Sequence, residues 1–480
     1  MDSTRSAPSS FHSPTKSDGR RATISKRVER DTAYPRPVPT STEPLVAVVG
    51  GGLAGMAAAA RLAKMGHRVR LHEATDRLGG AWAPYALAGP DAGSEPVLVD
   101  DAPAVLTFPA PWRDLFRKSG RPLEAELARS GYALAPAPPT VVHHADGSTL
   151  ALPSDRGEQQ EALLRTYGPG PAARWQHLLD SLDDVWQALR PLGLEEPWER
   201  GSLDRGLARR LWSRRSLADL ADDLGEPHLR ALMRATAYRL GTTPEQAPAL
   251  AAAGLLVERT FGRWQVVAEP GRALDTGRTS VLVETLAARL GLRRVEVRLG
   301  SRVEGVEAAG STVTGVRTSE AGTEPADAVV LAVDPWTAAS LAPAPAARSL
   351  RRALRRATPA RLPRAEHVLL DTAEDAPAAG HPVAEHLHLD ADGRPRVVTL
   401  RRLGDRVVRT TVDHRPDQLE DRPGAGLVTG GFRGWRRRPG TATGTPGLAL
   451  AGAASPSGPS PWAVVQSGAL AAYAVAGRRD

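Results

Sequence analysis

The sequence predicts an α/β fold in which a parallel β-sheet carries an inserted α+β region. Three observations predict it. A short apolar strand, a glycine-rich turn, an alanine-rich helix and a second strand follow one another between residues 45 and 73. The chain from about 111 to 270 is mainly helical in its apolar spacing, and strand-like segments dominate 295–333 and 366–414. A chain of 480 residues is long enough for two or three domains.

The opening unit has the order expected of a phosphate-binding turn. The run from Leu45 to Val49 is apolar and β-branched, as in a buried parallel strand. Gly50, Gly52 and Gly55 follow with G-x-G-x-x-G spacing, and residues 56–65 are helical in composition. The first glycine permits the tight turn, the second lets a pyrophosphate approach the backbone, and the third lets the helix pack on the strand. The helix N-terminus then offers free N–H groups to phosphates.

The unit closes with an acidic residue. Gly66 ends the helix, residues 69–71 begin a second strand, and Glu73 stands at the end of that strand, where an acid accepts a ribose hydroxyl. Glu73 argues against NADP, because its carboxylate would repel a 2′-phosphate. The whole series predicts a bound dinucleotide, and leaves NAD and FAD open.

The stretch Arg77-Leu78-Gly79-Gly80 bears on that choice. An acid followed by a short spacer, Arg and Gly-Gly resembles the extended fingerprint of the amine-oxidase-like flavoproteins, and this resemblance implies FAD. The other interpretation of Arg77 is a solvated charge at a strand end.

Later stretches resemble the same family. Residues 301–335 are similar to its second nucleotide-contacting unit, in which the backbone at Val303 meets the adenine and Ala332 lies at the pyrophosphate. Residues 447–472 resemble its C-terminal flavin motif, whose helix N-terminus faces the N1–C2=O edge of the flavin. The stretches 100–127 and 240–252 resemble the bacterial phytoene desaturase (carotenoid dehydrogenase-like) branch rather than the monoamine oxidase branch.

The resemblance implies a glutathione-reductase-like FAD-binding Rossmann domain, assembled from separated segments, with an inserted α+β substrate domain. We expect a disordered tail (1–43), three FAD-binding segments (44–110, 271–335 and 444–480), a helical substrate segment (111–270) and a β-rich substrate segment (336–443). The residues expected to contact FAD are Gly50, Gly52, Leu53, Ala54, Gly55, Glu73, Ala74, Arg77, Gly79, Gly80, Ala81, Val303, Ala332, Gly452, Ala453, Ala463 and Val464.

The chain departs from the family pattern in two places. The usual GGMG segment is replaced by residues 269–280, in which only Gly271 and Gly277 remain. The usual Thr-His-Pro-Gly of the C-terminal loop reads Ser-Pro-Ser-Gly at 455–458. A changed substrate, or a flavoprotein without enzymatic activity, would agree with these departures.

The resemblance implies FAD-dependent dehydrogenation of a hydrophobic polyene or isoprenoid-like substrate, with flavin N5 as the hydride acceptor and O2 or a quinone as the final acceptor. The cofactor would carry the redox step, so the sequence singles out no catalytic side chain. Two alternatives share the fold: an oxidase acting on an amine or a secondary metabolite, and a redox-neutral isomerase. Lysine occurs only at positions 16, 26, 64 and 118, which argues against the amine oxidases, since they typically place a lysine beside the flavin.

Composition adds three expectations. The net charge of +8 comes almost entirely from arginine and needs no nucleic-acid partner. No apolar run reaches the roughly 18 residues needed to cross a bilayer, and the tail has no secretory or twin-arginine pattern, so we expect a cytoplasmic protein. The arginines at 351, 352, 355 and 356 indicate a solvated helix face or, alternatively, peripheral contact with an anionic membrane.

We expect no metal site. The chain has no cysteine, and His386 and His388 share one strand face without an evident third ligand; the other histidines considered are at 143, 144, 367 and 381. Among the tryptophans at 264, 336 and 462, each also compatible with a place in the core, Trp462 is the best candidate for the substrate wall because it lies in the loop expected over the flavin.

Overall fold

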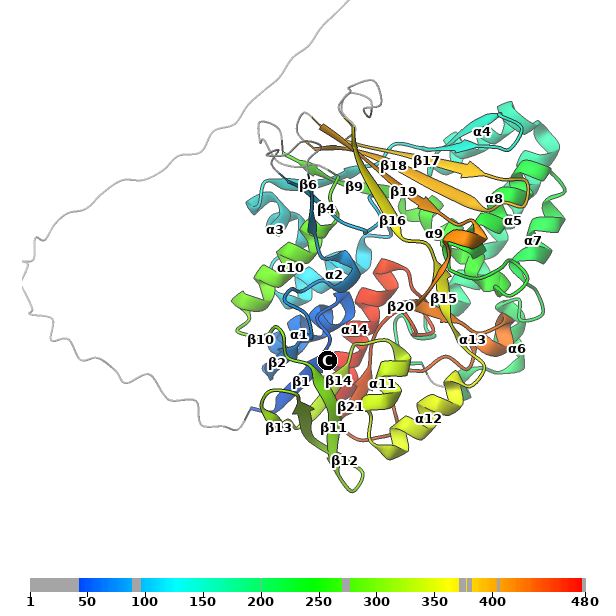
Figure 1. Cartoon of the computed structure of the whole chain (residues 1–480). Helices are drawn as coiled ribbons and strands as arrows, with labels where there is room; N and C mark the ends of the chain where they lie inside the picture. Colours follow the sequence, from blue (N-terminus) through cyan, green and yellow to red (C-terminus); the bar gives the residue numbers. More distant parts are fainter. Residues whose placement is uncertain are drawn as a thin grey trace, which may run out of the picture. The chain divides into compact units, whose positions relative to one another are not determined.

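The central element of the computed structural model is a five-stranded sheet (Figure 1). The model describes residues 43–88, 96–198, 200–269, 277–370, 377, 382–403 and 406–476. Every neighbouring pair of strands in the sheet is parallel. Its strand order is β10 (Glu296–Arg298), β2 (Arg68–His72), β1 (Leu45–Val49), β14 (Ala328–Leu331) and β21 (Leu448–Leu450).

One face of this sheet is covered by helices. The alanine-rich helix α1 (Leu53–Lys64) contacts α14 (Pro461–Ala476), α10 (Ser280–Leu292) and α2 (Ala110–Ser119). Val46 and Val48 of β1 point into this core, as the alternation of side chains along a strand requires. The small side chains of α1 let α14 approach closely: a Cβ atom on Gly468, in the middle of α14, would stand 2.2 Å from the carbonyl oxygen of Ala54.

The other face packs against a second small layer. An antiparallel sheet of β11 (Val303–Ala309), β12 (Thr312–Thr318) and β13 (Gly322–Pro325) lies there with α11 (Pro335–Leu341) and α12 (Ala344–Leu354). Ala47 and Val49, the intervening residues of β1, belong to this second core. The middle of the sheet is therefore buried on both faces, which explains why β1, β14 and β21 are unbroken apolar runs.

A six-stranded sheet forms the second part of the molecule, at the top of Figure 1. Helices lie beside it. In order, its strands are β16 (Ala365–Leu370), β19 (Arg406–Asp413), β18 (Pro395–Leu403), β17 (Val383–Leu389), β7 (Thr140–His143) and β8 (Thr149–Leu152). The helices of this part are α4 (Arg156–Tyr167), α5 (Pro169–Leu189), α6 (Arg205–Arg210), α7 (Leu217–Leu224), α8 (Pro227–Arg239) and α9 (Ala253–Phe261).

Smaller elements complete the described chain. They are the paired strands β3 (Tyr85–Leu87) and β4 (Val97–Val99), the sheet of β5 (Leu106–Thr107), β9 (Arg263–Ala268) and β6 (Tyr132–Pro136), the pair β15 (Thr358–Leu362) and β20 (Glu420–Val428), and the helices α3 (Leu123–Arg129) and α13 (Gly431–Trp435).

A buried ion pair connects the two parts. Arg401 of β18 donates to the carboxylate of Asp100 at 2.9 Å and to the carbonyl of Ala102 at 3.1 Å. The second oxygen of Asp100 accepts the backbone N–H of Ser280, at the start of α10. Asp100 is fully buried and Arg401 is 2% exposed, so this network fixes the six-stranded sheet to a helix of the parallel-sheet layer.

The α/β prediction is confirmed, and one local expectation was wrong. The apolar spacing of 217–237 predicts one helix, but the chain forms α7 and α8, because Gly225 adopts a φ of +67° and Pro227 starts the next helix. The mainly helical segment 111–270 also holds strands β6 to β9. The domain boundaries given above remain a prediction, and residues 1–42, within the expected tail, lie outside the described residues.

Candidate FAD and substrate site

The glycine-rich turn lies at the carboxyl end of β1. Gly50 has a φ of +103°, and a Cβ atom on Gly55 would stand 1.9 Å from the carbonyl oxygen of Gly50. Only glycine therefore fits at position 55, as its expected packing role requires. A Cβ atom on Gly52 would meet no atom within 4 Å, so the backbone at Gly52 borders open space at the N-terminus of α1.

The acid and the second glycine pair lie directly against this turn. Glu73 accepts hydrogen bonds from the backbone N–H of Gly51 at 2.7 Å and of Thr75 at 2.8 Å. The N–H of Gly79 donates to the carbonyl of Gly51 at 2.8 Å. Gly51 thus connects Glu73 with Gly79, two residues predicted to contact FAD. The sequence analysis did not single out Gly51, although it is the middle of three consecutive glycines. Arg77 is exposed and makes no ion pair with a described residue.

The second predicted unit reaches the same edge of the sheet. The N–H of Ser301 donates to the carbonyl of Glu73 at 2.9 Å, which brings the start of β11 beside β2. The side chain of Val303 is buried among apolar residues, so the backbone is the part that could meet an adenine. Ala332 follows β14, and its carbonyl oxygen is the atom that a Cβ on Gly50 would meet at 2.5 Å.

The C-terminal segment contributes a loop and a helix start. Gly452, after β21, donates its N–H to the hydroxyl of Ser467 at 2.9 Å. In the first turn of α14, the amides of Ala463 and Val464 both donate to the carbonyl of Ser460, whereas that of Trp462 has no partner among the described residues. Ala463 and Val464 remain predicted flavin contacts, and the unpaired amide of Trp462 is a further donor at the N-terminus of α14.

Together these segments fit an extended dinucleotide. The turn at Gly52 has free space where a pyrophosphate would lie, and the N-terminus of α1 gives it positive polarity. Glu73 also accepts a hydrogen bond from the hydroxyl of Thr75 at 2.9 Å, which leaves one lone-pair position, on Oε2, for a ribose hydroxyl. Doubly wound sheets bind nucleotides beyond the carboxyl ends of their strands, where the strand order reverses, which here is between β1 and β14. The remaining predicted residues, which flank those described above, are Leu53, Ala54, Ala74, Gly80, Ala81 and Ala453.

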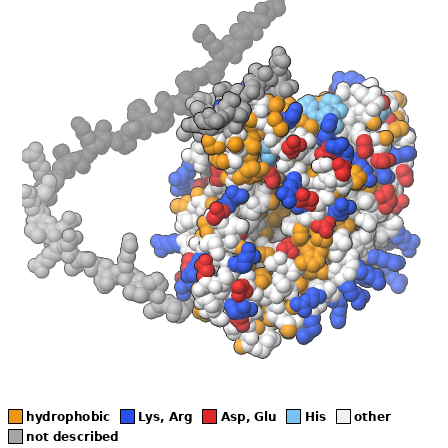
Figure 2. All heavy atoms as spheres, in the orientation of Figure 1, with side chains coloured by type: hydrophobic (Ala, Val, Ile, Leu, Met, Phe, Trp, Pro, Cys, Tyr) orange, Lys and Arg blue, Asp and Glu red, His pale blue; other side chains and the backbone are white. Residues whose placement is uncertain are grey.

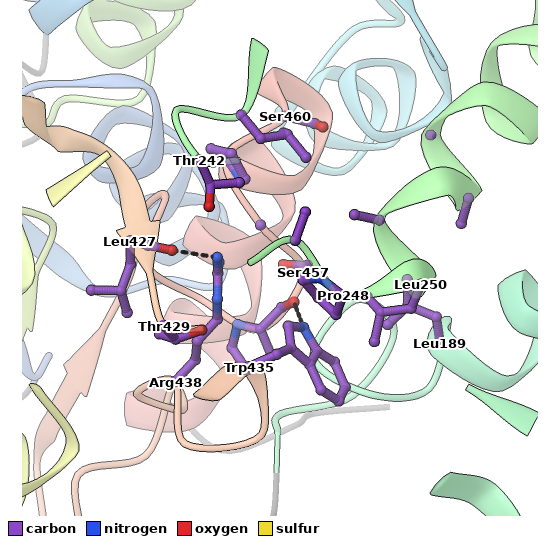
Figure 3. A pocket seen from close by; sticks show the side chains of 18 of the residues that line it. Leu189, Thr242, Pro248, Leu250, Leu427, Thr429, Trp435, Arg438, Ser457 and Ser460 are labelled. Atoms are coloured by element: carbon purple, nitrogen blue, oxygen red, sulfur yellow. Dashed lines mark hydrogen bonds between the residues drawn. The ribbon is translucent and has the colours of Figure 1, made fainter. Parts of the chain in front are cut away.

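A large apolar pocket opens beside the C-terminal loop. It encloses about 870 Å3 of space free of protein atoms, open solvent at its mouth included, and is drawn in Figure 3. Its walls come from α5, from the chain between Leu240 and Val257, from the end of β20, from α13 and from the loop 456–462. Since this loop leads into α14, the pocket lies next to the region expected to hold the flavin.

Aromatic rings form one side of this pocket. Trp186 and Trp462 both line it, with ring centroids 5.9 Å apart in an edge-to-face arrangement. Phe108 packs edge-to-face on both rings at 5.7 and 5.4 Å, a favourable geometry. Phe108 has a φ of +48°, uncommon for a bulky residue and a form of strain often found at functional sites. Trp462 thus lies in the wall of this pocket, and its contact with substrate remains a prediction.

The divergent Ser-Pro-Ser-Gly loop is held by two residues that sequence reasoning missed. Trp435 donates its indole N–H to the carbonyl of Pro456 at 3.0 Å, and Arg438 donates to the carbonyls of Ser455 at 3.2 Å and Leu427 at 2.6 Å. Figure 3 draws both side chains among the residues that line the pocket. Their only sequence signal was an aromatic residue beside an arginine run, which resembles a solvated surface.

The other tryptophans considered lie elsewhere. Trp264 on β9 donates to the carbonyl of Phe261 and stacks under the guanidinium of Arg113. Trp336 borders a separate surface pocket between α11 and α12. Lys64 is exposed and Lys118 pairs with Asp114, so neither of the two described lysines lines the apolar pocket. Gly277 is described, but Gly271 and His381 lie outside the described residues.

Histidines gather on the six-stranded sheet, visible at the top of Figure 2. His143 of β7 lies opposite His388 of β17 with the rings stacked 4.3 Å apart, and its Nε2 is 3.0 Å from Nδ1 of His386. Even so, no group of three or more His, Cys, Asp or Glu residues in the described chain could hold a metal ion. His367 pairs instead with Asp101.

A second histidine pair predicts a pH-dependent stability. His144 is buried. Its Nε2 is hydrogen-bonded to the hydroxyl of Tyr167 at 2.7 Å, and its ring centroid lies 4.3 Å from that of His228. Burial, and then the neighbouring His228, lower the pKa of His144 to about 4, against partial opposition from Asp146 and Glu226. Between pH 6.5 and pH 4, His144 is therefore protonated in the unfolded state but largely neutral in the folded state. The free energy of unfolding falls as the pH drops through this range.

We expect the shifted pKa of His144 to lower the free energy of unfolding by about 2 kcal/mol when the pH is reduced from 7 to 5. Urea unfolding at the two pH values measures it, with H144Q as the comparison. In H144Q the free energy of unfolding should change less between the two pH values, by the amount assigned to His144. An equal pH effect in both proteins would contradict the assignment.

The family is shown by comparison with known proteins. Residues 53–360 match the model of the flavin containing amine oxidoreductase family. The chain belongs to this family, and its cofactor is FAD. Of the solved structures, wild-type putrescine oxidase has a TM-score of 0.60 at 17% identity, covering 90% of this chain and 97% of that one. Cyclohexylamine oxidase from Brevibacterium oxydans has a TM-score of 0.58 at 16% identity over 90% and 98%. These likenesses confirm the predicted fold.

Within the family, the chain is similar to carotenoid desaturases, as its sequence predicted. It is 31% identical over 304 residues to hydroxyneurosporene desaturase of Cereibacter sphaeroides, covering 61% of this chain and 56% of the relative. It is 27% identical over 306 residues to 4,4'-diapolycopene oxygenase of a Methylomonas species, covering 59% and 54%. The chain thus spans about half the length of the curated relatives it matches.

Proposed function

We propose that this protein is an FAD-dependent dehydrogenase that desaturates a hydrophobic polyene or isoprenoid-like substrate. The observation that carries the proposal is the apolar pocket with its aromatic side, set beside the loop that leads into α14. The relatives named above are a desaturase and an oxygenase of polyenes. Bound FAD would supply the hydride acceptor at its N5 atom.

The protein's own part is to position the substrate and exclude water. Trp186, Trp462 and the apolar side chains from Leu240 to Val257 offer a surface that favours an extended hydrocarbon chain. The free amide of Trp462, at the positive end of α14, would stabilise the negative charge that develops on a reduced flavin. Among the described residues that line the pocket there is no carboxylate, histidine or lysine, so this wall offers no ordinary general base for the proton that leaves with the hydride.

The test is a reaction without oxygen. Purified protein loaded with FAD is mixed with phytoene in liposomes, and the visible absorbance of the flavin and the spectrum of the polyene are followed. We expect the flavin to be reduced and a longer chromophore to form. If neither change occurs with phytoene, the carotenoid form of the proposal is wrong.

Two alternative functions would give different results. A flavin oxidase acting on an amine or a secondary metabolite would produce peroxide with such a compound and ignore polyenes; the structural likeness to putrescine oxidase supports its fold only. An isomerase would rearrange its substrate with reduced FAD and consume no acceptor. With the desaturase, either O2 or a quinone would reoxidise the flavin, and each can be supplied separately after the anaerobic step.

We also propose that the protein collects its substrate at an anionic membrane surface through α12. Its arginines at 348, 351, 352, 355 and 356 are all exposed, and Figure 2 shows blue side chains gathered over this part of the molecule. No helix in the described part of the chain has both the length and the apolar character of a membrane span. Each arginine near an anionic surface contributes about 1 kcal/mol of attraction.

Replacing Arg351, Arg352, Arg355 and Arg356 with glutamine should therefore reduce co-sedimentation with phosphatidylserine-containing vesicles by more than about tenfold at low salt. The matched control removes four charges from other surfaces, namely Arg117, Arg165, Arg317 and Arg364. An equal loss in both variants would show that net charge alone is responsible, and would contradict a role for α12.

A further inference from the structure

Among the described residues that line the pocket, Arg438 is the one with a charged side chain. The other residues that line the pocket are apolar, or are neutral polar residues such as Thr242, Gln246 and Thr429. Arg438 forms no ion pair with a described residue. Its guanidinium donates to the carbonyl oxygens of Leu427 and Ser455. The guanidinium thus carries its charge into an apolar space without an acid to neutralise it.

The hydrogen-bonding capacity of this side chain is only partly used. A guanidinium has five N–H donors, and the Nε of Arg438 is buried without a partner in the structure. Burial lowers the pKa of Arg438 to about 10, so the group is still charged at neutral pH. An isolated buried charge is costly unless it is paired. The position of Arg438 in the wall therefore favours a ligand that supplies the missing negative charge.

Arg438 is also well fixed for such a role. The carbonyl of Leu427, at the end of β20, and the carbonyl of Ser455, in the loop before α14, hold its two terminal nitrogens. Trp435, one turn earlier in the chain, anchors the same loop through Pro456. Figure 3 shows the guanidinium of Arg438 beside Leu427, facing the side of the pocket that Thr242 contributes. A ligand that enters the pocket would thus meet an oriented cation.

We propose that the substrate is a hydrophobic chain that ends in a carboxylate, and that Arg438 binds this carboxylate while the apolar walls bind the chain. This inference rests on the proposed function and adds to it the chemical class of the substrate end. Arg438 is a specificity residue in this scheme, because the carboxylate end would lie apart from the carbon atoms that react. A guanidinium pairs with a carboxylate through two parallel hydrogen bonds, which also orients the chain.

The test uses two polyenes that differ only at one end. All-trans-retinoic acid and all-trans-retinol are titrated into the FAD-loaded protein, and quenching of the fluorescence of the pocket tryptophans reports binding. We expect the acid to bind at least about tenfold more tightly than the alcohol, the range of a charge-assisted hydrogen bond. In R438Q the preference should disappear, with retinol affinity within about twofold of the wild type. R438K should keep part of it.

The control variant is R436Q, which removes the exposed arginine that caps the C-terminus of α13, two residues before Arg438, and its preference should equal that of the wild type. Thermal melting and flavin content show whether R438Q is folded. An equal loss of affinity for retinoic acid and retinol in R438Q would show that Arg438 only supports the folded structure. A changed flavin reduction potential with an unchanged preference for the acid would show that Arg438 acts on the cofactor instead of on the carboxylate. Either result overturns the inference, as does a wild type without preference.

The two proposals can fail independently. If phytoene reduces the flavin equally well in wild type and R438Q, and retinoic acid is not preferred, the dehydrogenase proposal stands and the carboxylate is wrong. If no polyene reduces the flavin but retinoic acid binding still depends on Arg438, the acid site is real and the dehydrogenase proposal is wrong.

Discussion

Replacing Gly52 with valine is expected to give a folded protein that does not retain FAD. Gly52 has a φ of −74°, which any residue can adopt, and a Cβ atom there meets nothing within 4 Å. The fold therefore tolerates the side chain. The same space is where the pyrophosphate would contact the backbone, so the added methyl groups would displace it. We expect the affinity for FAD to fall by roughly 100-fold or more, about 3 kcal/mol.

The comparison with Gly55 makes this prediction specific. A Cβ atom on Gly55 would stand 1.9 Å from the carbonyl oxygen of Gly50, so G55A should disturb the packing of α1 on β1 even without cofactor. Flavin absorbance after purification, FAD titration and thermal melting of the apoprotein separate the effects. G52V should lose FAD and keep its melting temperature, whereas G55A should lose both. A yellow G52V protein would contradict the proposed pyrophosphate position.

The nucleotide turn was predictable because its chemistry depends on local order. The glycine spacing, the following alanines and the acid at 73 lie within one short segment of chain, and each has a backbone reason that sequence shows directly. The structure adds the hydrogen bonds between residues that are distant in the sequence. Gly51 lies between Glu73 and Gly79 through two hydrogen bonds, a relation that no local pattern encodes.

The pocket was less predictable because it is assembled from distant segments. Trp462 could be named because it follows a recognisable glycine loop. Arg438 and Trp186 meet it only in the folded chain, and an arginine in a run of arginines resembles a solvated surface. The break between α7 and α8 had a local cause, Gly225 followed by Pro227, but the apolar spacing continued across it and favoured one helix.

Replacing Asp100 with alanine is expected to cost about 3–5 kcal/mol of the free energy of unfolding. The carboxylate accepts from Arg401 at 2.9 Å and from the backbone N–H of Ser280 at 3.0 Å. Removing it leaves the buried guanidinium of Arg401 with carbonyl partners only, the backbone oxygens of Asp100 and Ala102, and leaves the Ser280 amide unpaired. An unneutralised buried charge is the larger of these two losses.

Urea unfolding measures the effect, and the matched control is E304Q. Glu304 pairs with Arg317 at 3.2 Å on the surface, where both side chains are nearly half exposed, and such pairs contribute about 0–1 kcal/mol. The double variant D100A/R401M should recover part of the loss, because it removes the uncompensated charge together with its partner. Since Asp100 and Arg401 connect β18 with the start of α10, recovery would show that charge neutralisation holds these two parts of the molecule together. A D100A effect no larger than that of E304Q would show that apolar packing is sufficient for this contact.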